Sequence, residues 1–318
     1  MRVLVTGGGG FIGSHISEAL LHDGHDVRVL DNFATGRREN LLHLQGDIDL
    51  VEGDIQSYER VHNAVTGCDV VFHQAAMPSV PRSIQDPLTS NASNVIGTLN
   101  VLLASRDSNV RRVVFASSSS VYGANREMPK RENQTPLPIS PYAVAKLASE
   151  GYCRSFHAVY GLQTVALRYF NVFGPRQDPL SQYAAVVPNF IVAALSGCRP
   201  TIFGDGEQSR DFTFVSNIVQ ANRLAMRTED IAGCIFNIAC GARITLNEVI
   251  DTLSELTDRQ IEPIHESPRV GDIQHSLADV ALAREKLGFE PVVELRAGLV
   301  KTIEYYERRA LGAQAQSL

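Results

Sequence analysis

The chain begins Met1-Arg-Val-Leu-Val-Thr-Gly-Gly-Gly-Gly-Phe-Ile-Gly-Ser14, and this stretch decides the fold. Residues 2–6 form a short, mostly apolar run, which is typical of a buried parallel strand. Gly7, Gly10 and Gly13 follow at G-x-x-G-x-x-G spacing, where a helical pattern begins. The first glycine allows a sharp turn, the second lets backbone approach a pyrophosphate, and the third allows close packing of helix on strand. The stretch therefore predicts a dinucleotide-binding strand, turn and helix.

An acidic residue ends the next predicted strand. Residues 26–30 lead into Asp31, which lies 18 positions after Gly13. A carboxylate about 20 residues beyond such a glycine turn holds the ribose hydroxyls of NAD. Arg37 and Arg38 in the following loop offer an alternative, because two guanidiniums could hold the 2′-phosphate of NADP. Asp31 would repel that phosphate, so the sequence favours NAD, with the basic pair as a solvated helix start.

The composition excludes several classes of protein. Of 318 residues, 44% are hydrophobic and 20% charged, which is typical of a soluble globular chain. A net charge of −6 without long runs of one sign favours neither nucleic acid nor an anionic membrane as a partner. We see no apolar run that could span a bilayer and no signal peptide, so we expect a cytoplasmic protein. The five scattered cysteines indicate no disulfide framework and no metal site.

Strand and helix patterns alternate through the first half of the chain, which predicts a doubly wound parallel sheet. Further strands are expected at residues 48–51, 69–73, 112–116 and 164–169, with a long helix over residues 84–107. The alternation breaks down after this. The expected fold class is α/β, with a Rossmann-type NAD-binding domain at 1–170 and a smaller α/β substrate lobe at 171–318, from which some segments return to the first domain.

The stretch Ser140-Pro-Tyr-Ala-Val-Ala-Lys146 predicts an acid–base pair. Ser140 suits a helix N-cap, with proline at the first helical position. Tyr142 and Lys146 then share one face of the helix, and a nearby ammonium and nicotinamide cation would favour the phenolate. Ser118, at the end of the fifth predicted strand, can hydrogen-bond the same substrate oxygen. Together the three side chains can move a proton on or off an alcohol while hydride passes to or from a nicotinamide.

The remaining cofactor contacts are expected at the carboxyl ends of the strands, where ligands bind in open α/β sheets. The predicted cofactor-binding residues are Gly7, Gly10, Phe11, Ile12, Gly13, Asp31, Asn32, Asp54, Ile55, Gln74, Ala75, Ala76, Tyr142 and Lys146.

With these motifs the chain resembles the extended short-chain dehydrogenase/reductase family, in its sugar-nucleotide epimerase branch, over about residues 1–310. The resemblance is closest to bacterial UDP-N-acetylglucosamine 4-epimerases. It is carried by residues 73–76, 79–84, 168–174, 176–179, 183–186, 204–212 and 271–279. It implies a homodimer formed through a four-helix bundle, for which the helices near 84–107 and 140–160 are candidates.

The resemblance also implies where a UDP-sugar binds. Arg210 and Arg269 take the places of diphosphate-binding arginines, with surface ion pairing as the alternative. Ser276 stands where epimerases restricted to unacetylated sugars carry a tyrosine, which leaves space for a 2-acetamido group. Ser119 and Ser120 would contact that group, or are turn residues. The full substrate-binding set is Ser119, Ser120, Asn171, Gln177, Ala185, Val186, Arg210, Arg269, Asp272 and Ser276.

The implied activity is C4 epimerisation of UDP-GlcNAc/UDP-GalNAc, and also of UDP-Glc/UDP-Gal, through a 4-keto intermediate. A 4,6-dehydratase or a UDP-glucuronate decarboxylase would need an acid where Ser119 and Ser120 stand, which disfavours both. A UDP-glucuronate 4-epimerase stays open, because these serines could form a pocket for a carboxylate. The alternative of another class is a non-catalytic NAD(H)-sensing or scaffold protein on the same fold. The intact set of Ser118, Tyr142 and Lys146 disfavours it.

Overall fold

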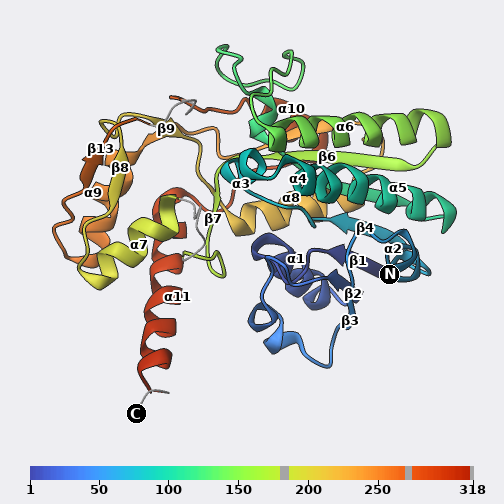
Figure 1. Ribbon diagram of the computed structural model, residues 1–318, viewed down its shortest axis with the longest axis horizontal. Coiled ribbons are helices and arrows are strands. Elements are labelled where there is room, and N and C mark those ends of the chain that lie inside the picture. Colours follow the sequence, from blue (N-terminus) through green and yellow to red (C-terminus); the bar gives the residue numbers. More distant parts are fainter. Residues whose placement is uncertain (180–185, 269–273, 316–318) are drawn as a thin grey trace.

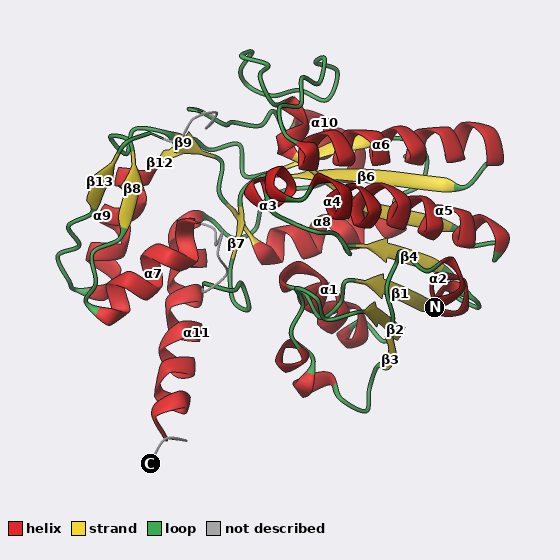
Figure 2. Ribbon diagram, in the orientation of Figure 1, coloured by secondary structure: helices red, strands yellow, loops and turns green. Residues whose placement is uncertain are grey.

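The computed structural model describes residues 1–179, 186–268 and 274–315, with side chains through residue 309. At its centre lies a seven-stranded parallel sheet with the strand order β11-β6-β5-β4-β1-β2-β3 (Figures 1 and 2). Its strands are β1 (Arg2–Thr6), β2 (Asp26–Asp31), β3 (Asp49–Glu52), β4 (Val70–His73), β5 (Arg112–Ser118), β6 (Gln163–Tyr169) and β11 (Ile235–Ile238). The chain reverses its winding direction between β1 and β4, which opens a ligand crevice at the carboxyl ends of these strands.

Helices cover both faces of this sheet. They are α1 (Phe11–His22), α2 (Tyr58–Val65), α5 (Gly97–Asp107), α6 (Pro141–Tyr160), α8 (Val215–Arg227) and α10 (Ala281–Leu287). Ile16 of α1 and Ile218 of α8 belong to the core on one face. Val61 of α2, Val101 of α5 and Phe156 of α6 belong to the core on the other face. Burial on both sides explains the continuous valine and leucine runs in the strands.

The expected long helix over 84–107 is wrong as a single element. The structure divides it into α3 (Val80–Gln85), α4 (Pro87–Asn91), a π-helical turn η3 (Ala92–Ile96) and α5. Pro87 cannot continue a helix, and the Asp86 side chain caps the next one by accepting from the Thr89 N–H at 3.0 Å. The π turn carries Asn94, whose side chain binds both backbone groups of Met77. Apolar periodicity alone does not reveal such interruptions.

The second half of the chain forms smaller paired elements, drawn at the left of Figure 1. These elements are β7 (Val172–Phe173), α7 (Val186–Ser196), β8 (Thr201–Phe203), β9 (Ser209–Arg210), β10 (Thr213–Phe214), β12 (Ile244–Thr245), α9 (Leu246–Thr257), β13 (Ile264–Glu266) and α11 (Leu295–Ala315). The strands pair as β7 with β10, β8 with β13, and β9 with β12. β11 and α8 also come from this half, yet they join the central sheet and the layer on it. No helix in the described ranges is long and apolar enough to cross a membrane.

Candidate active site

The glycine turn after β1 has the geometry that its spacing predicts. Gly7 has a φ of 71°, and a Cβ there would lie 2.6 Å from the backbone nitrogen of Ala75. A Cβ on Gly13 would lie 2.1 Å from the carbonyl oxygen of Gly7, so only glycine lets α1 pack this closely. Gly10 is the N-cap of α1 without a capping side chain, and the first turn carries no acid. The positive end of the helix is therefore available to an anion.

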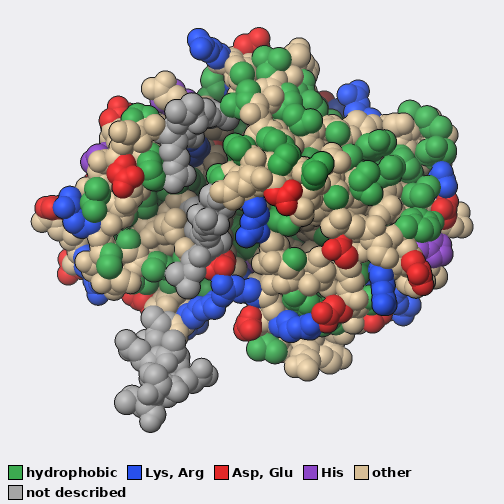
Figure 3. All heavy atoms as spheres, in the orientation of Figure 1, with side chains coloured by type: hydrophobic (Ala, Val, Ile, Leu, Met, Phe, Trp, Pro, Cys, Tyr) green, Lys and Arg blue, Asp and Glu red, His purple; other side chains and the backbone are tan. Residues whose placement is uncertain are grey.

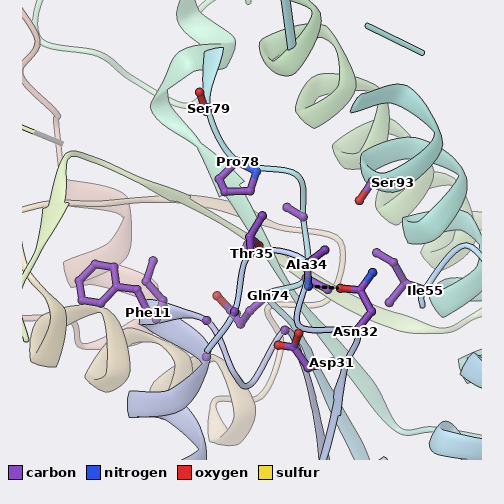
Figure 4. A pocket seen from close by; sticks show the side chains of 18 of the residues that line it. Phe11, Asp31, Asn32, Ala34, Thr35, Ile55, Gln74, Pro78, Ser79 and Ser93 are labelled. Carbon is purple, nitrogen blue, oxygen red and sulfur yellow. Dashed lines mark hydrogen bonds between the residues drawn. The ribbon is translucent and has the colours of Figure 1, made fainter. Parts of the chain in front are cut away.

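A cavity of about 650 Å³ lies at this edge of the sheet. All of the residues predicted to bind the cofactor line it. Figure 4 shows Phe11 on one side of this space and Asn32 and Ile55 on the other. The Asn32 side chain is fixed in this place, because its Oδ1 accepts from the Ala34 N–H at 3.0 Å and its Nδ2 donates to Asp54 at 2.8 Å. The cavity has the size expected of a cofactor site.

Asp31 is buried at the cavity wall. Its carboxylate accepts the N–H groups of Gly9 at 2.8 Å and Phe33 at 2.7 Å. Burial raises the pKa of Asp31, and these two hydrogen bonds oppose that shift. Arg37 pairs with Asp178 at 2.6 Å, and Arg38 pairs with Glu52 at 2.5 Å. Because both guanidiniums are already paired with carboxylates, the local charge favours NAD over NADP.

Lys146 is fixed beneath the inner end of the cavity. The cap predicted for its helix is present, since the Ser140 hydroxyl accepts from the Ala143 N–H at 3.2 Å. The Lys146 ammonium donates to the carbonyl of Ala116 at 2.8 Å and lies 5.9 Å from the Tyr142 ring centroid. Burial lowers the pKa of Lys146 to about 8.

Tyr142 lies partly exposed to the cavity but is surrounded by protein. Burial raises its pKa, and a hydrogen bond with Ser118 opposes this shift. Among the protein's own groups the desolvation of the phenolate outweighs the favourable interaction. That Lys146 and the nicotinamide cation together favour the phenolate stays a prediction.

Ser118, Ser119 and Ser120 form a tight turn at the end of β5. Ser118 ends β5 and caps the short helix η4 (Ser119–Tyr122). Its Oγ accepts from the Ser120 backbone N–H at 3.2 Å and from the Ser120 hydroxyl at 2.9 Å. Ser120 thus supports Ser118, which favours its interpretation as a turn residue. Ser119 lies half-buried in the same turn.

The predicted substrate residues do not all gather in the cavity. Gln177 lines it, whereas the described residues Ser119, Ser120, Asn171, Val186, Arg210 and Ser276 do not. Asn171 has a φ of 32°, in the left-handed region that asparagine tolerates better than most residues. Val186 begins α7. Ala185, Arg269 and Asp272 lie outside the described residues.

Arg210 and Ser276 belong to one small ribbon. The Ser276 N–H donates to the carbonyl of Ser209 at 3.0 Å, next to Arg210 in β9. Asp211 links this ribbon to neighbouring segments, because its carboxylate accepts the backbone N–H groups of Cys240 at 3.0 Å and Ala278 at 3.2 Å. Burial raises the pKa of Asp211 to about 6. The sequence motif marked this stretch, but the role of Asp211 was not predicted.

Several cavity residues were also missed. They are Leu30, Ala34, Thr35, Gly36, Arg37, Asn40, Gly53, Pro78, Ser79, Arg82, Ser93, Ala116, Ser117, Tyr169, Arg176 and Asp178. Most of them lie on loops that follow the strand ends. The strand-end rule indicates these loops but not which of their side chains point inward.

Two buried polar atoms in the cavity wall have no hydrogen-bond partner in the part of the chain that the structure describes. Gln177 Oε1 and one terminal guanidinium nitrogen of Arg176 are buried without a hydrogen-bond partner among the described residues, and both residues line the wall. Polar atoms of this kind suit a polar ligand. In the described ranges no three His, Cys, Asp or Glu side chains are grouped so as to hold a metal ion.

A tyrosine with its lysine at the inner wall of a dinucleotide cavity, on a sheet of this order, defines the short-chain dehydrogenase/reductase class. Comparison with known proteins narrows this class. A family model described as NAD dependent epimerase/dehydratase family matches residues 3–239. The chain belongs to this family, and its cofactor is NAD.

Three relatives show how close the similarity is. The solved UDP-N-acetylglucosamine 4-epimerase of Methanobrevibacter ruminantium M1, in complex with UDP-N-acetylmuramic acid, is 42% identical, with a TM-score of 0.93 over 97% of this chain and 98% of that one. The UDP-glucose 4-epimerase of Thermus thermophilus, solved with NAD, is 36% identical, with a TM-score of 0.87 over 96% and 99%. A UDP-N-acetyl-alpha-D-glucosaminuronate decarboxylase of Bacillus cytotoxicus is 35% identical over 96% and 97% of the two chains.

Proposed function

We propose that this chain is an NAD-dependent UDP-sugar 4-epimerase that interconverts UDP-GlcNAc and UDP-GalNAc and also accepts UDP-Glc and UDP-Gal. The observation that carries the proposal is that Tyr142 and the buried Lys146 line the NAD cavity together, where the Lys146 ammonium donates to the Ala116 carbonyl of β5, the strand that ends in Ser118. The similarity to two UDP-sugar 4-epimerases supports the same reaction.

In this proposal the chain's own residues move one proton out and back. Bound NAD supplies the hydride acceptor and donor for C4 of the sugar. Tyr142 as phenolate takes the proton of the 4-hydroxyl and later returns it, while Ser118 orients the 4-oxygen. Lys146 holds the nicotinamide ribose and places a positive charge near Tyr142. Between the two transfers the 4-keto sugar turns about its diphosphate link, so that hydride returns to the other face.

The substrate lobe would hold the rest of the ligand. Arg210 and Arg269 would bind the diphosphate, and Asn171 would bridge sugar or phosphate oxygens. Gln177, Ala185, Val186 and Asp272 would line the nucleotide and sugar pocket. Ser276 would leave room for a 2-acetamido group, near Ser119 and Ser120.

The test is an assay of the purified protein on UDP-GlcNAc, UDP-glucuronate and UDP-glucose side by side, without added reductant. The expected result is interconversion at C4 of UDP-GlcNAc and UDP-glucose. Turnover confined to UDP-glucuronate would favour the uronate epimerase instead, and release of CO2 would favour a decarboxylase. No turnover of any UDP-sugar would favour a non-catalytic NAD(H)-binding protein.

We also propose that the protein is a homodimer. α3 and α4 pack beside α6, and this face carries Ile84, Leu88 and Val144 with exposed fractions of 63%, 83% and 52%. Hydrophobic side chains gather over these helices in Figure 3. Two such helical faces would form a four-helix interface.

Light scattering after gel filtration tests the dimer. Leu88→Asp is expected to shift the mass from about two chains to one, because it places a charge in the apolar interface. Val292→Asp is the matched control, since Val292 is 66% exposed and its N–H donates to Asn217 of α8, which covers the other face of the sheet. A monomeric wild type, or equal effects of both substitutions, would contradict the proposed face.

A further inference from the structure

Three polar side chains form a buried layer directly behind the proposed catalytic residues. Glu150 and Arg168 are each 2% exposed, and Ser117 is 3% exposed. Glu150 lies one helical turn beyond Lys146 on α6, and Ser117 precedes Ser118 on β5. Arg168 of β6 lies opposite Ser117 in the register of the sheet. Each of the three residues is thus adjacent, in the fold or in the sequence, to a residue of the proposed active site.

The Glu150 carboxylate joins these three elements through hydrogen bonds. It accepts from Arg168 in a bidentate pair, with Nε to Oε1 at 2.8 Å and Nη2 to Oε2 at 2.7 Å. It also accepts from the Ser117 hydroxyl at 2.5 Å. Bidentate, charge-assisted bonds of this kind fix orientation more strongly than apolar contacts do. One side chain of α6 therefore holds the carboxyl ends of both β5 and β6.

Stability alone is a weak explanation for this arrangement. Two buried charges must be desolvated, and replacing such a pair by apolar side chains of similar volume is often neutral or stabilising. The third guanidinium nitrogen of Arg168 is buried without a hydrogen-bond partner among the described residues, which adds to the cost, although the guanidinium lies 4.7 Å from the centroid of the Tyr122 ring. A geometric role at the adjacent site explains why charged groups lie here.

We propose that Glu150 is a positioning residue for the reaction. By binding Ser117 and Arg168 it sets the position of α6 along β5, and with it the place of Tyr142 relative to Ser118 and of Lys146 on the Ala116 carbonyl. Glu150 does not line the cavity, so it acts through its neighbours, which include the Lys146 ammonium that its charge favours. The inference rests on the proposed epimerase function and deepens it.

The test uses a double variant, Glu150→Leu/Arg168→Met, which removes both charges together and leaves no unpaired ion. The thermal midpoint is expected to stay within a few degrees of wild type. We expect kcat on the wild type's best UDP-hexose to fall about 30-fold with KM within about twofold, because a misplacement below 1 Å slows chemistry more than binding.

A matched control lies at the first residue of β5, the strand that carries Ser117 near its other end. Arg112 of β5 is also 2% exposed and donates to backbone carbonyls of Ala225 and Thr228 at 2.8 and 2.6 Å. Arg112→Met should lower the thermal midpoint, because it leaves buried acceptors unpaired, and should leave kcat unchanged. The double variant would thus lose turnover without losing stability, and Arg112→Met would lose stability without losing turnover.

Ser117→Ala keeps the test open if the double variant does not fold. Ser117 also lines the cavity but is only 3% exposed, so removing its hydroxyl should leave KM constant and lower kcat about fivefold. A folded double variant with wild-type kcat would overturn the positioning role, and so would a Ser117→Ala protein with wild-type kcat. The role would also be overturned if Arg112→Met lost kcat together with its thermal midpoint. An inactive wild type would overturn the proposed function as well, so the two failures can be told apart.

Discussion

The NAD cavity and the proposed substrate lobe are built in different ways. The cavity wall comes from the ends of five- to seven-residue strands such as β1 and β5, whose side chains are almost fully buried. The lobe presents Arg210 and Ser276 on a two-residue strand and an adjoining loop, held by Asp211. The first region is fixed by a continuous sheet, and the second by a few side-chain bonds. We therefore expect changes in the first to abolish binding or chemistry, and changes in the second to shift selectivity.

The largest expected effect is that of Gly13→Val. Its side chain would enter the space of the Gly7 carbonyl, which a Cβ already reaches at 2.1 Å, so α1 must move away from β1. We expect purified variant protein to contain no bound NAD, measured by absorbance after denaturation, and to have no activity. Gly151→Ala is the control, because nothing lies within 4 Å of its new Cβ. Normal NAD content in Gly13→Val would contradict the role of the turn.

Lys146→Met should separate stability from activity. The folded pKa of about 8 lies below the ordinary value of 10.5, so the buried ammonium destabilises the fold fully below pH 8 and progressively less up to pH 10.5. At pH 7 the variant should gain about 2 kcal/mol of unfolding free energy, after the lost hydrogen bond to Ala116. Its kcat should fall about 100-fold.

Urea unfolding at pH 7 and pH 10 checks this prediction. The difference between variant and wild type should shrink as pH rises, because the folded wild-type lysine is deprotonated above its pKa of about 8 and no longer buries a charge. A variant that is less stable than wild type at pH 7 would show that Lys146 stabilises the fold instead.

Ser276→Tyr tests the substrate side of the comparison. A tyrosine in this position should fill the space proposed for the 2-acetamido group. We expect kcat/KM on UDP-GlcNAc to fall about 30-fold, and that on UDP-glucose to change less than threefold. Unlike Gly13→Val, the variant should keep its NAD. Equal losses on both sugars would argue against a selective role of Ser276.

The NAD cavity and the proposed substrate lobe also differ in how much of their structure the sequence predicted. The glycine turn, Asp31 and the pair of Tyr142 and Lys146 are local patterns, in which a few residues within one turn or strand end determine the geometry. Six of the seven strands of the sheet agree with the predicted ranges to within about two residues, because buried parallel strands require continuous apolar runs, whereas β11 was not predicted. The structure therefore places all of the predicted cofactor residues around one cavity.

The rest depends on contacts between residues far apart in the chain. Asp211 binds backbone N–H groups at Cys240 and Ala278, and Glu150 binds Arg168 and Ser117, yet no spacing rule connects these positions. The burial that raises the pKa of Tyr142 is likewise invisible in local spacing, because desolvation depends on the whole surrounding core.

The most direct test of the proposed chemistry is the turnover of Tyr142→Phe on UDP-GlcNAc, compared with wild type. Phenylalanine keeps the ring and removes the hydroxyl that exchanges the proton. We expect kcat to fall about 1000-fold or more, with NAD content and UDP-GlcNAc affinity within about threefold of wild type. Wild-type turnover in Tyr142→Phe would contradict the proposed role of the Ser118, Tyr142 and Lys146 site.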